Sequence, residues 1–195
     1  MSAPRETPRN VPGDARSRRT LVAIVLVVLA PVVLSYGFYY LAPPGRFTNY
    51  GELLPTVAFP AVQGTRADGA PFDLASLHGR WALVLAAPAA CDAGCAAALY
   101  AGRQARAIQG KDSERVVRVW LASGEQAPDP ALLREHPDVI VARVPASAAA
   151  ALPRGAQPLY FVDPLGNQVL AWPRDPDVKA MAKDIGRLLK ASRIG

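Results

Sequence analysis

The chain has 195 residues, of which 51% are hydrophobic and 7% aromatic, so it is long enough for one folded domain and does not have the composition of a disordered protein. Its formal net charge is +6, but residues 50–195 carry 16 Lys and Arg against 14 Asp and Glu. Because the charge beyond residue 50 is nearly balanced, no basic face for nucleic acid is indicated, and no nucleic-acid partner is expected.

A long apolar segment follows the basic N-terminal tail, residues 1–20. Residues 21–41 contain no charged side chain, and a helix of about 20 residues crosses a hydrocarbon core of about 30 Å. Arginines precede the segment and tyrosines stand near its end, as at the two interfaces of a membrane. We therefore expect one transmembrane helix in a bacterial inner membrane, with the N-terminus in the cytoplasm and the following domain in the periplasm.

Removal of this segment as an export signal is the alternative. Arg18 and Arg19 resemble part of a twin-arginine motif. The apolar run is longer than a usual signal core of about 7 to 15 residues, however, and no small-x-small cleavage site follows it before residue 45. The sequence thus favours a retained anchor, a Pro- and Gly-containing linker over residues 42–51, and a folded domain over residues 52–195.

Beyond the linker, short apolar runs alternate with helical patterns. The elements expected in chain order are strands or turns within 55–64 and 68–74, a strand at Trp81–Ala86, a helix at 91–109, a strand at Val116–Ala122, a helix at Pro130–His136, a strand at Val139–Val144, a helical turn at 148–152, strands at 159–162 and 168–172 joined by a hairpin turn, and a helix at 176–192. This order predicts an α/β fold, a thioredoxin-like sheet with flanking helices.

Two cysteines, Cys91 and Cys95, are the residues that most clearly indicate chemistry. They stand between the strand ending at Ala86 and an alanine-rich helix, with Cys91, Cys95, Ala98, Gly102 and Ala105 on one face. Side chains four apart on a helix are neighbours, and a helix N-terminus stabilises thiolates. Such a pair can form a disulfide, exchange with a partner's disulfide, or bind Cu(I) through soft sulfur ligands.

Plainer interpretations of these residues stay open. The cysteines could form a purely structural disulfide, although a bridge that closes so short a loop removes little chain entropy. A structural zinc site would need four ligands, and only His78 and His136 could add to the cysteines. Both histidines are expected to be solvated turn residues away from the cysteines. Arg174, Asp175 and Asp177 are expected to solvate the start of the last helix, and the three tryptophans to pack in the core or at a sheet edge.

The chain resembles the Sco family, membrane-anchored thioredoxin-like proteins that handle copper during assembly of cytochrome c oxidase. The resemblance covers about residues 50–195 and includes the segment at 73–81, the spacing of Cys91 and Cys95, and the segment Tyr160-Phe161-Val162-Asp163-Pro164-Leu165-Gly166. It implies that Cys91 and Cys95 bind copper as Cu(I) or act in redox exchange. It also implies cytochrome c oxidase subunits or assembly factors as partners.

This sequence departs from the family at the third copper ligand. Family members add a histidine five residues before the aromatic residue of the Tyr-x-x-Asp-Pro segment, and Gly155 stands at that position. Prolines usual around the family's cysteines are replaced by Asp92 and Ala96. No histidine ligand therefore carries over, although two thiolates can still hold Cu(I) in a low-coordinate arrangement.

Three functions remain open at this stage. The first is a Sco-like assembly factor that delivers Cu(I) or reduces copper-site cysteines, with Cys91 as the attacking thiolate and Cys95 as the resolving one. The second is an enzyme, a general thiol–disulfide oxidoreductase, for which the CxxxC spacing is a poor match to the usual CxxC. The third is a non-catalytic scaffold that docks on oxidase subunits through its thioredoxin-like fold.

Overall fold

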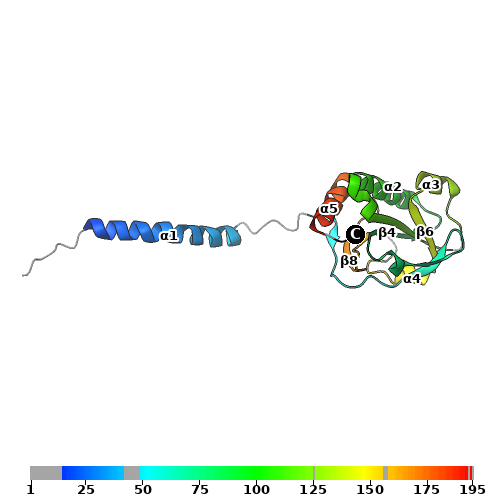
Figure 1. Cartoon of the computed structure of the whole chain (residues 1–195), viewed down its shortest axis with the longest axis horizontal. Helices are drawn as coiled ribbons and strands as arrows, with labels where there is room; N and C mark the ends of the chain where they lie inside the picture. The colour runs from blue at the N-terminus through cyan, green and yellow to red at the C-terminus, as the bar shows by residue number, and fades with distance from the viewer. Residues whose placement is uncertain (1–14, 42–48, 125, 156–157, 193, 195) are drawn as a thin grey trace, which may run out of the picture. The chain divides into compact units, whose positions relative to one another are not determined.

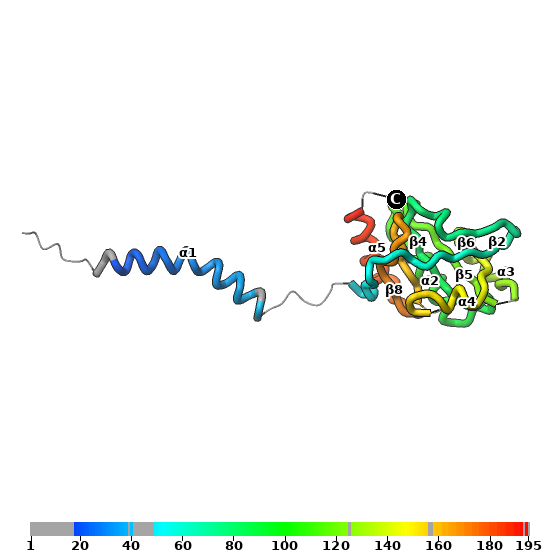
Figure 2. Tube along the Cα trace, turned by 90° about the horizontal axis from the view of Figure 1, so that it is seen from below, coloured from blue at the N-terminus to red at the C-terminus, as the bar shows by residue number. Residues whose placement is uncertain are grey.

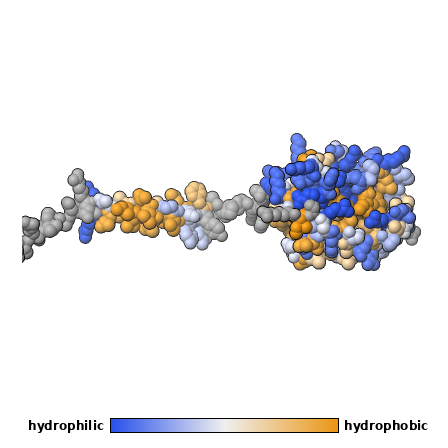
Figure 3. All heavy atoms as spheres, viewed as in Figure 1, coloured by the Kyte–Doolittle hydropathy of each residue, from blue (hydrophilic) through white to orange (hydrophobic). Residues whose placement is uncertain are grey.

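The computed structural model describes residues 15–41, 49–124, 126–155, 158–192 and 194, and the chain divides into two compact units, residues 1–48 and 49–195. In the first unit, helix α1 spans Ala15–Leu41 and contains Pro31. Its segment Arg18–Phe38 has a mean hydropathy of 2.6 and is long and apolar enough to cross a membrane (Figure 3). Residues 1–14 of the predicted tail and 42–48 of the predicted linker lie outside the described residues.

The second unit is built on one mixed sheet. Within the described residues, eight strands lie in the order β1-β8-β7-β4-β5-β6-β2-β3. Strands β4, β5 and β6 are parallel, whereas β7 pairs antiparallel with β4, β8 with β7, β1 with β8, and β2 with both β6 and β3. The strands are β1 (Glu52–Leu53), β2 (Gln63–Arg66), β3 (Pro71–Asp73), β4 (Trp81–Pro88), β5 (Val116–Ser123), β6 (Val139–Val144), β7 (Leu159–Val162) and β8 (Gln168–Trp172). Figure 2 shows β8 toward one side of this sheet and β2 toward the other.

Helices cover both faces of the sheet. The helices and 3₁₀ turns of this unit are η1 (Leu74–Leu77), α2 (Ala93–Ala107), η2 (Gly110–Arg115), α3 (Pro130–Glu135), α4 (Ala146–Ala150) and α5 (Val178–Ala191). Helices α2 and α5 pack on one face, and α4 lies on the opposite side (Figure 1). The face opposite α2 is covered by η1 and by apolar residues that precede it, including Phe59 and Val62.

The sequence of β4 is one unbroken apolar run because both faces of this strand are covered. Its odd-numbered residues, such as Leu83 and Leu85, pack in the cluster with α2 and α5, while Val84 and Ala86 pack in the cluster on the other face. Successive side chains of a strand point to opposite faces, so a central strand covered on both sides needs apolar residues at every position. Each buried leucine stabilises the fold by roughly 1.5 to 3 kcal/mol.

The expected fold class is confirmed, and most expected elements are present. The predicted bounds of β6, β7 and β8 agree with the structure, and all three tryptophans are buried. The hairpin turn forms because the Asp163 carboxylate accepts hydrogen bonds from the backbone N–H groups of Leu165 and Asn167. Two helices begin later than predicted, α2 at Ala93 and α5 at Val178, because an aspartate caps each of them one residue earlier.

Candidate functional site

The two cysteines lie beyond the carboxyl end of β4, where the chain turns into α2. They form a disulfide with a Cα–Cα distance of 5.2 Å. Just before them, the backbone N–H of Ala89 donates to the carbonyl of Ser123 over 2.8 Å and ties this turn to the end of β5. Cys95 is 1% exposed, whereas Cys91 is only partly buried. Of the two sulfur-bearing residues, Cys91 is therefore the one that a reaction partner reaches first.

Helix α2 holds Cys95 firmly against the sheet. Asp92 is the N-cap, and its Oδ1 atom accepts a hydrogen bond of 2.9 Å from the backbone N–H of Cys95. The buried residues of the helix include Cys95, Ala98, Gly102 and Ala105, which confirms the predicted small-residue face. A Cβ atom on Gly102 would lie 3.0 Å from the side chain of Leu83, so glycine at this position allows α2 to approach β4 closely.

Arg174 is the residue of this site that the sequence did not reveal. It lies in the loop between β8 and α5, and its Nη2 atom donates to Oδ1 of Asp92 in an ion pair. Its guanidinium lies over residues 91–95, here called the cysteine loop although its last residues already belong to α2; a Cβ atom on Gly94 would meet Nε of Arg174 at 2.9 Å. The prediction that Arg174 only solvates the start of the last helix is wrong, whereas Asp177 does cap that helix.

The same ion pair reinforces the negative charge of the cap. The hydrogen bond from Arg174 holds the pKa of the Asp92 carboxyl below its ordinary value, and the hydrogen bond from the Cys95 backbone acts in the same direction. Asp92 is therefore a carboxylate at neutral pH. A negative charge, on the residue that follows Cys91, and a positive charge, from the loop between β8 and α5, thus lie beside the disulfide.

The buried side chain of Arg118 joins β5 to α2 and to an aspartate that precedes β6. Arg118 of β5 is 2% exposed; it donates to the carbonyl of Leu99 in α2 and to Oδ1 of Asp138, each over 2.7 Å. His136 is 4% exposed and its Nδ1 atom lies 3.5 Å from Nη2 of Arg118. Burial, and then the Arg118 charge, lower the pKa of His136. The prediction that His136 is solvated is wrong, because the chain after α3 folds back against β5.

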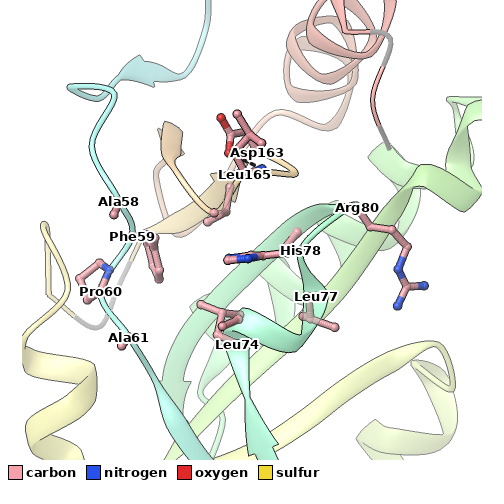
Figure 4. A pocket seen from close by; sticks show the side chains of 14 residues that line it. Ala58, Phe59, Pro60, Ala61, Leu74, Leu77, His78, Arg80, Asp163 and Leu165 are labelled. Atoms are coloured by element: carbon pink, nitrogen blue, oxygen red, sulfur yellow. Dashed lines mark hydrogen bonds between the residues drawn. The ribbon is translucent and has the colours of Figure 1, made fainter.

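His78 is exposed, as predicted, and lies at the other end of β4. It lines a cavity of about 190 Å³ together with Phe59, Leu74 and Leu165. Figure 4 shows the imidazole pointing between Leu74 and Leu165 and the Arg80 side chain pointing away from it. Strand β4 has eight residues, and a strand rises by about 3.3 Å per residue. The strand therefore separates this cavity from the turn that carries the cysteines by roughly 25 Å.

Among the described residues, the side chains do not complete a copper site of three protein ligands. In the part of the chain that the structure describes, no group of three or more His, Cys, Asp and Glu side chains could hold a metal ion. Gly155, at the position of the family's histidine, has a φ of +70°, and its carbonyl accepts a hydrogen bond of 3.0 Å from the Tyr160 hydroxyl. Once the disulfide is reduced, Cys91 and Cys95 offer two sulfur ligands, which suit Cu(I).

Comparisons with known proteins agree with this fold. A family model described as a transmembrane-like, thioredoxin-like, C-terminal domain matches residues 81–192. No curated protein matches the chain. Among solved structures, the chain is similar to copper-bound yeast Sco1, at 18% identity and a TM-score of 0.58, over 71% of this chain and 96% of that one.

Two further solved structures are similar to this chain in fold. Copper-bound ScoI of Bradyrhizobium japonicum matches at 17% identity and a TM-score of 0.53, over 67% of this chain and 99% of that one. The thioredoxin domain of a thiol-disulfide oxidoreductase from Bacteroides vulgatus matches at 16% identity and a TM-score of 0.52, over 70% of this chain and 99% of that one. The resemblance to Sco proteins is thus confirmed in the fold, which thiol-disulfide oxidoreductases share.

Proposed function

The chain belongs to the family of transmembrane-like, thioredoxin-like C-terminal domains, and from that membership we propose that it is a membrane-anchored, Sco-like factor that works by thiol–disulfide exchange through Cys91 and Cys95. One observation carries the proposal: a partly buried cysteine is bonded to a fully buried one at the start of α2. In this arrangement partners can reach the sulfur of Cys91, whereas the sulfur of Cys95 can only resolve the mixed disulfide that Cys91 forms. We further propose that its substrates are the copper-site cysteines of cytochrome c oxidase.

The exchange has two steps in the reducing direction. The Cys91 thiolate attacks one sulfur of a partner disulfide, and the other partner sulfur leaves as a thiolate that takes up a proton. The Cys95 thiolate then attacks the Cys91 sulfur, and the first partner sulfur leaves in the same way. The partner disulfide is reduced by two electrons, and the Cys91–Cys95 disulfide forms.

The compartment that we propose for the domain fits this chemistry. We propose the organisation expected from the sequence: a cytoplasmic tail at residues 1–20, a span at 21–41 in a bacterial inner membrane, a linker at 42–51, and a periplasmic domain at 52–195. Disulfides persist in the periplasm and are rare in the cytoplasm. Helix α1 supports the anchor by its length and hydropathy.

Delivery of Cu(I) is the second candidate, supported by the fold shared with copper-bound Sco structures. The reduced cysteines would hold Cu(I) as cargo between two thiolates and pass it on by ligand exchange with partner thiols. An anaerobic Cu(I) titration of the reduced chain, with a competing chelator, tests this candidate. Stoichiometric binding that Cys91→Ser/Cys95→Ser loses would support delivery, and absence of binding would exclude it.

A trapping experiment tests the exchange itself. In Cys95→Ser, the mixed disulfide between Cys91 and a partner cannot be resolved, so we expect it to accumulate with the copper-site subunit of cytochrome c oxidase. Cys91→Ser is the matched control, because the remaining cysteine is buried and should trap little. Equal trapping by both variants, or by neither, would refute exchange through Cys91.

The scaffold alternative gives a different result in cells. If the fold only docks on oxidase subunits, a strain that carries Cys91→Ser/Cys95→Ser keeps full cytochrome c oxidase activity. Loss of that activity, with the variant present at its normal level in the membrane, rules out a purely structural role.

A further inference from the structure

A pair of opposite charges lies directly beside the disulfide. Asp92 follows Cys91 in the chain, and its carboxylate accepts hydrogen bonds both from the Cys95 backbone and from Arg174. Neither charge is buried: the Asp92 side chain is 61% exposed and that of Arg174 is 33% exposed. A molecule that reaches Cys91 therefore meets both charges.

We propose that Arg174 determines which thiols this site accepts as reductants, by cancelling the charge of Asp92 and so admitting thiols that carry further negative charge close to their sulfur. The inference rests on the proposed exchange function and names the class of thiol that returns its disulfide to the reduced state. A thiolate is itself an anion, so a bare carboxylate beside Cys91 would repel it, and would repel a thiolate with acidic neighbours more strongly.

The sequence around Arg174 makes its charge decisive. Residues 173–177 read Pro-Arg-Asp-Pro-Asp, so Arg174 is the one cation of this segment. The Asp177 carboxylate accepts a hydrogen bond from the backbone N–H of Ala180 and so caps α5, and Asp175 is exposed. Without Arg174, the cysteine loop and this segment would together present acidic groups only, Asp92, Asp175 and Asp177.

The affected step is the attack that opens the Cys91–Cys95 disulfide, which forms in each round of exchange and is reduced by a thiol before the next round. The thiolate of this reductant forms a bond to the Cys91 sulfur, the Cys91–Cys95 bond breaks, and Cys95 leaves as a thiolate that takes up a proton. A second reductant thiolate attacks the sulfur bonded to Cys91 and releases Cys91, so two reductant thiols become one disulfide while the cysteine pair gains two electrons. In water, one unit charge at about 7 Å changes the rate of such an encounter roughly threefold.

The test compares small thiols of different charge. The oxidised full chain in detergent is reduced at low salt by 2-mercaptoethanesulfonate, which is anionic, and by 2-aminoethanethiol, which is cationic, with each rate expressed per thiolate. For Arg174→Gln, we expect the ratio of the anionic to the cationic rate constant to fall by roughly five- to tenfold, since the two thiols differ by two charges. The fall should largely disappear at about 1 M salt, where the screening length is about 3 Å.

Three variants separate charge from structure. Arg174→Lys should keep the wild-type ratio, and Asp92→Asn should raise it. Arg80→Gln removes the same charge at the opposite end of β4 and should leave the ratio unchanged. An unchanged ratio in Arg174→Gln, or an equal fall in Arg80→Gln, would overturn the role of Arg174. Failure of both thiols to reduce the wild-type chain would instead refute the proposed exchange function.

Discussion

Reduction of the Cys91–Cys95 disulfide should leave the domain folded. The bridge joins residues only four apart, and the chain-entropy relation for so small a loop gives about 2 kcal/mol at 25 °C. Cys95 is one buried member of the apolar cluster on the α2 face, whereas the other buried residues of that cluster and the whole cluster on the opposite face contain no part of the bridge. For a unit of this size, a loss of about 2 kcal/mol lowers the melting temperature by about 4 to 8 °C.

The assay is chemical and thermal unfolding of the full chain with and without a phosphine reductant. Cys91→Ala/Cys95→Ala serves as the control, because its unfolding should not respond to the reductant. A loss of more than about 4 kcal/mol on reduction, or outright unfolding, would refute the reasoning. The disulfide would then be a structural bridge, and a protein that unfolds whenever its disulfide is reduced could not cycle in exchange.

Two further predictions concern the supporting structure. Because burial and Arg118 lower the pKa of His136, the folded state favours the neutral ring; stability is therefore full above the ordinary histidine pKa of about 6.5 and falls as the pH drops below it. Unfolding at pH 7.5 and pH 5 should show this loss, and an equal loss in His136→Gln would contradict it. Gly166→Ala should destabilise the domain by about 0.5 to 1.5 kcal/mol more than Gly69→Ala, since both glycines have a φ of +86° but only at Gly166 would the added Cβ overlap the His78 ring, and this exposed side chain would have to leave its rotamer. Equal unfolding free energies of the two variants would argue against this contact.

Features encoded by local patterns could be predicted from the sequence. The unbroken apolar run of β4, the small-residue face of α2 and the hairpin around Asp163 each follow from residues within a few positions of one another. Strand and helix periods and turn hydrogen bonds act over this range, so the fold class and the place of Cys91 and Cys95 were accessible without coordinates.

The surroundings of the cysteines were decided by the tertiary structure alone. Arg174 reaches Asp92 from 82 residues along the chain, because β8 and the start of α5 bring its loop to the end of β4 where α2 begins. His136 is buried against Arg118 because the segment between α3 and β6 folds back onto β5. A charged residue in a turn looks solvated in any local pattern, and only the packing of distant elements determines which opposite charge it meets.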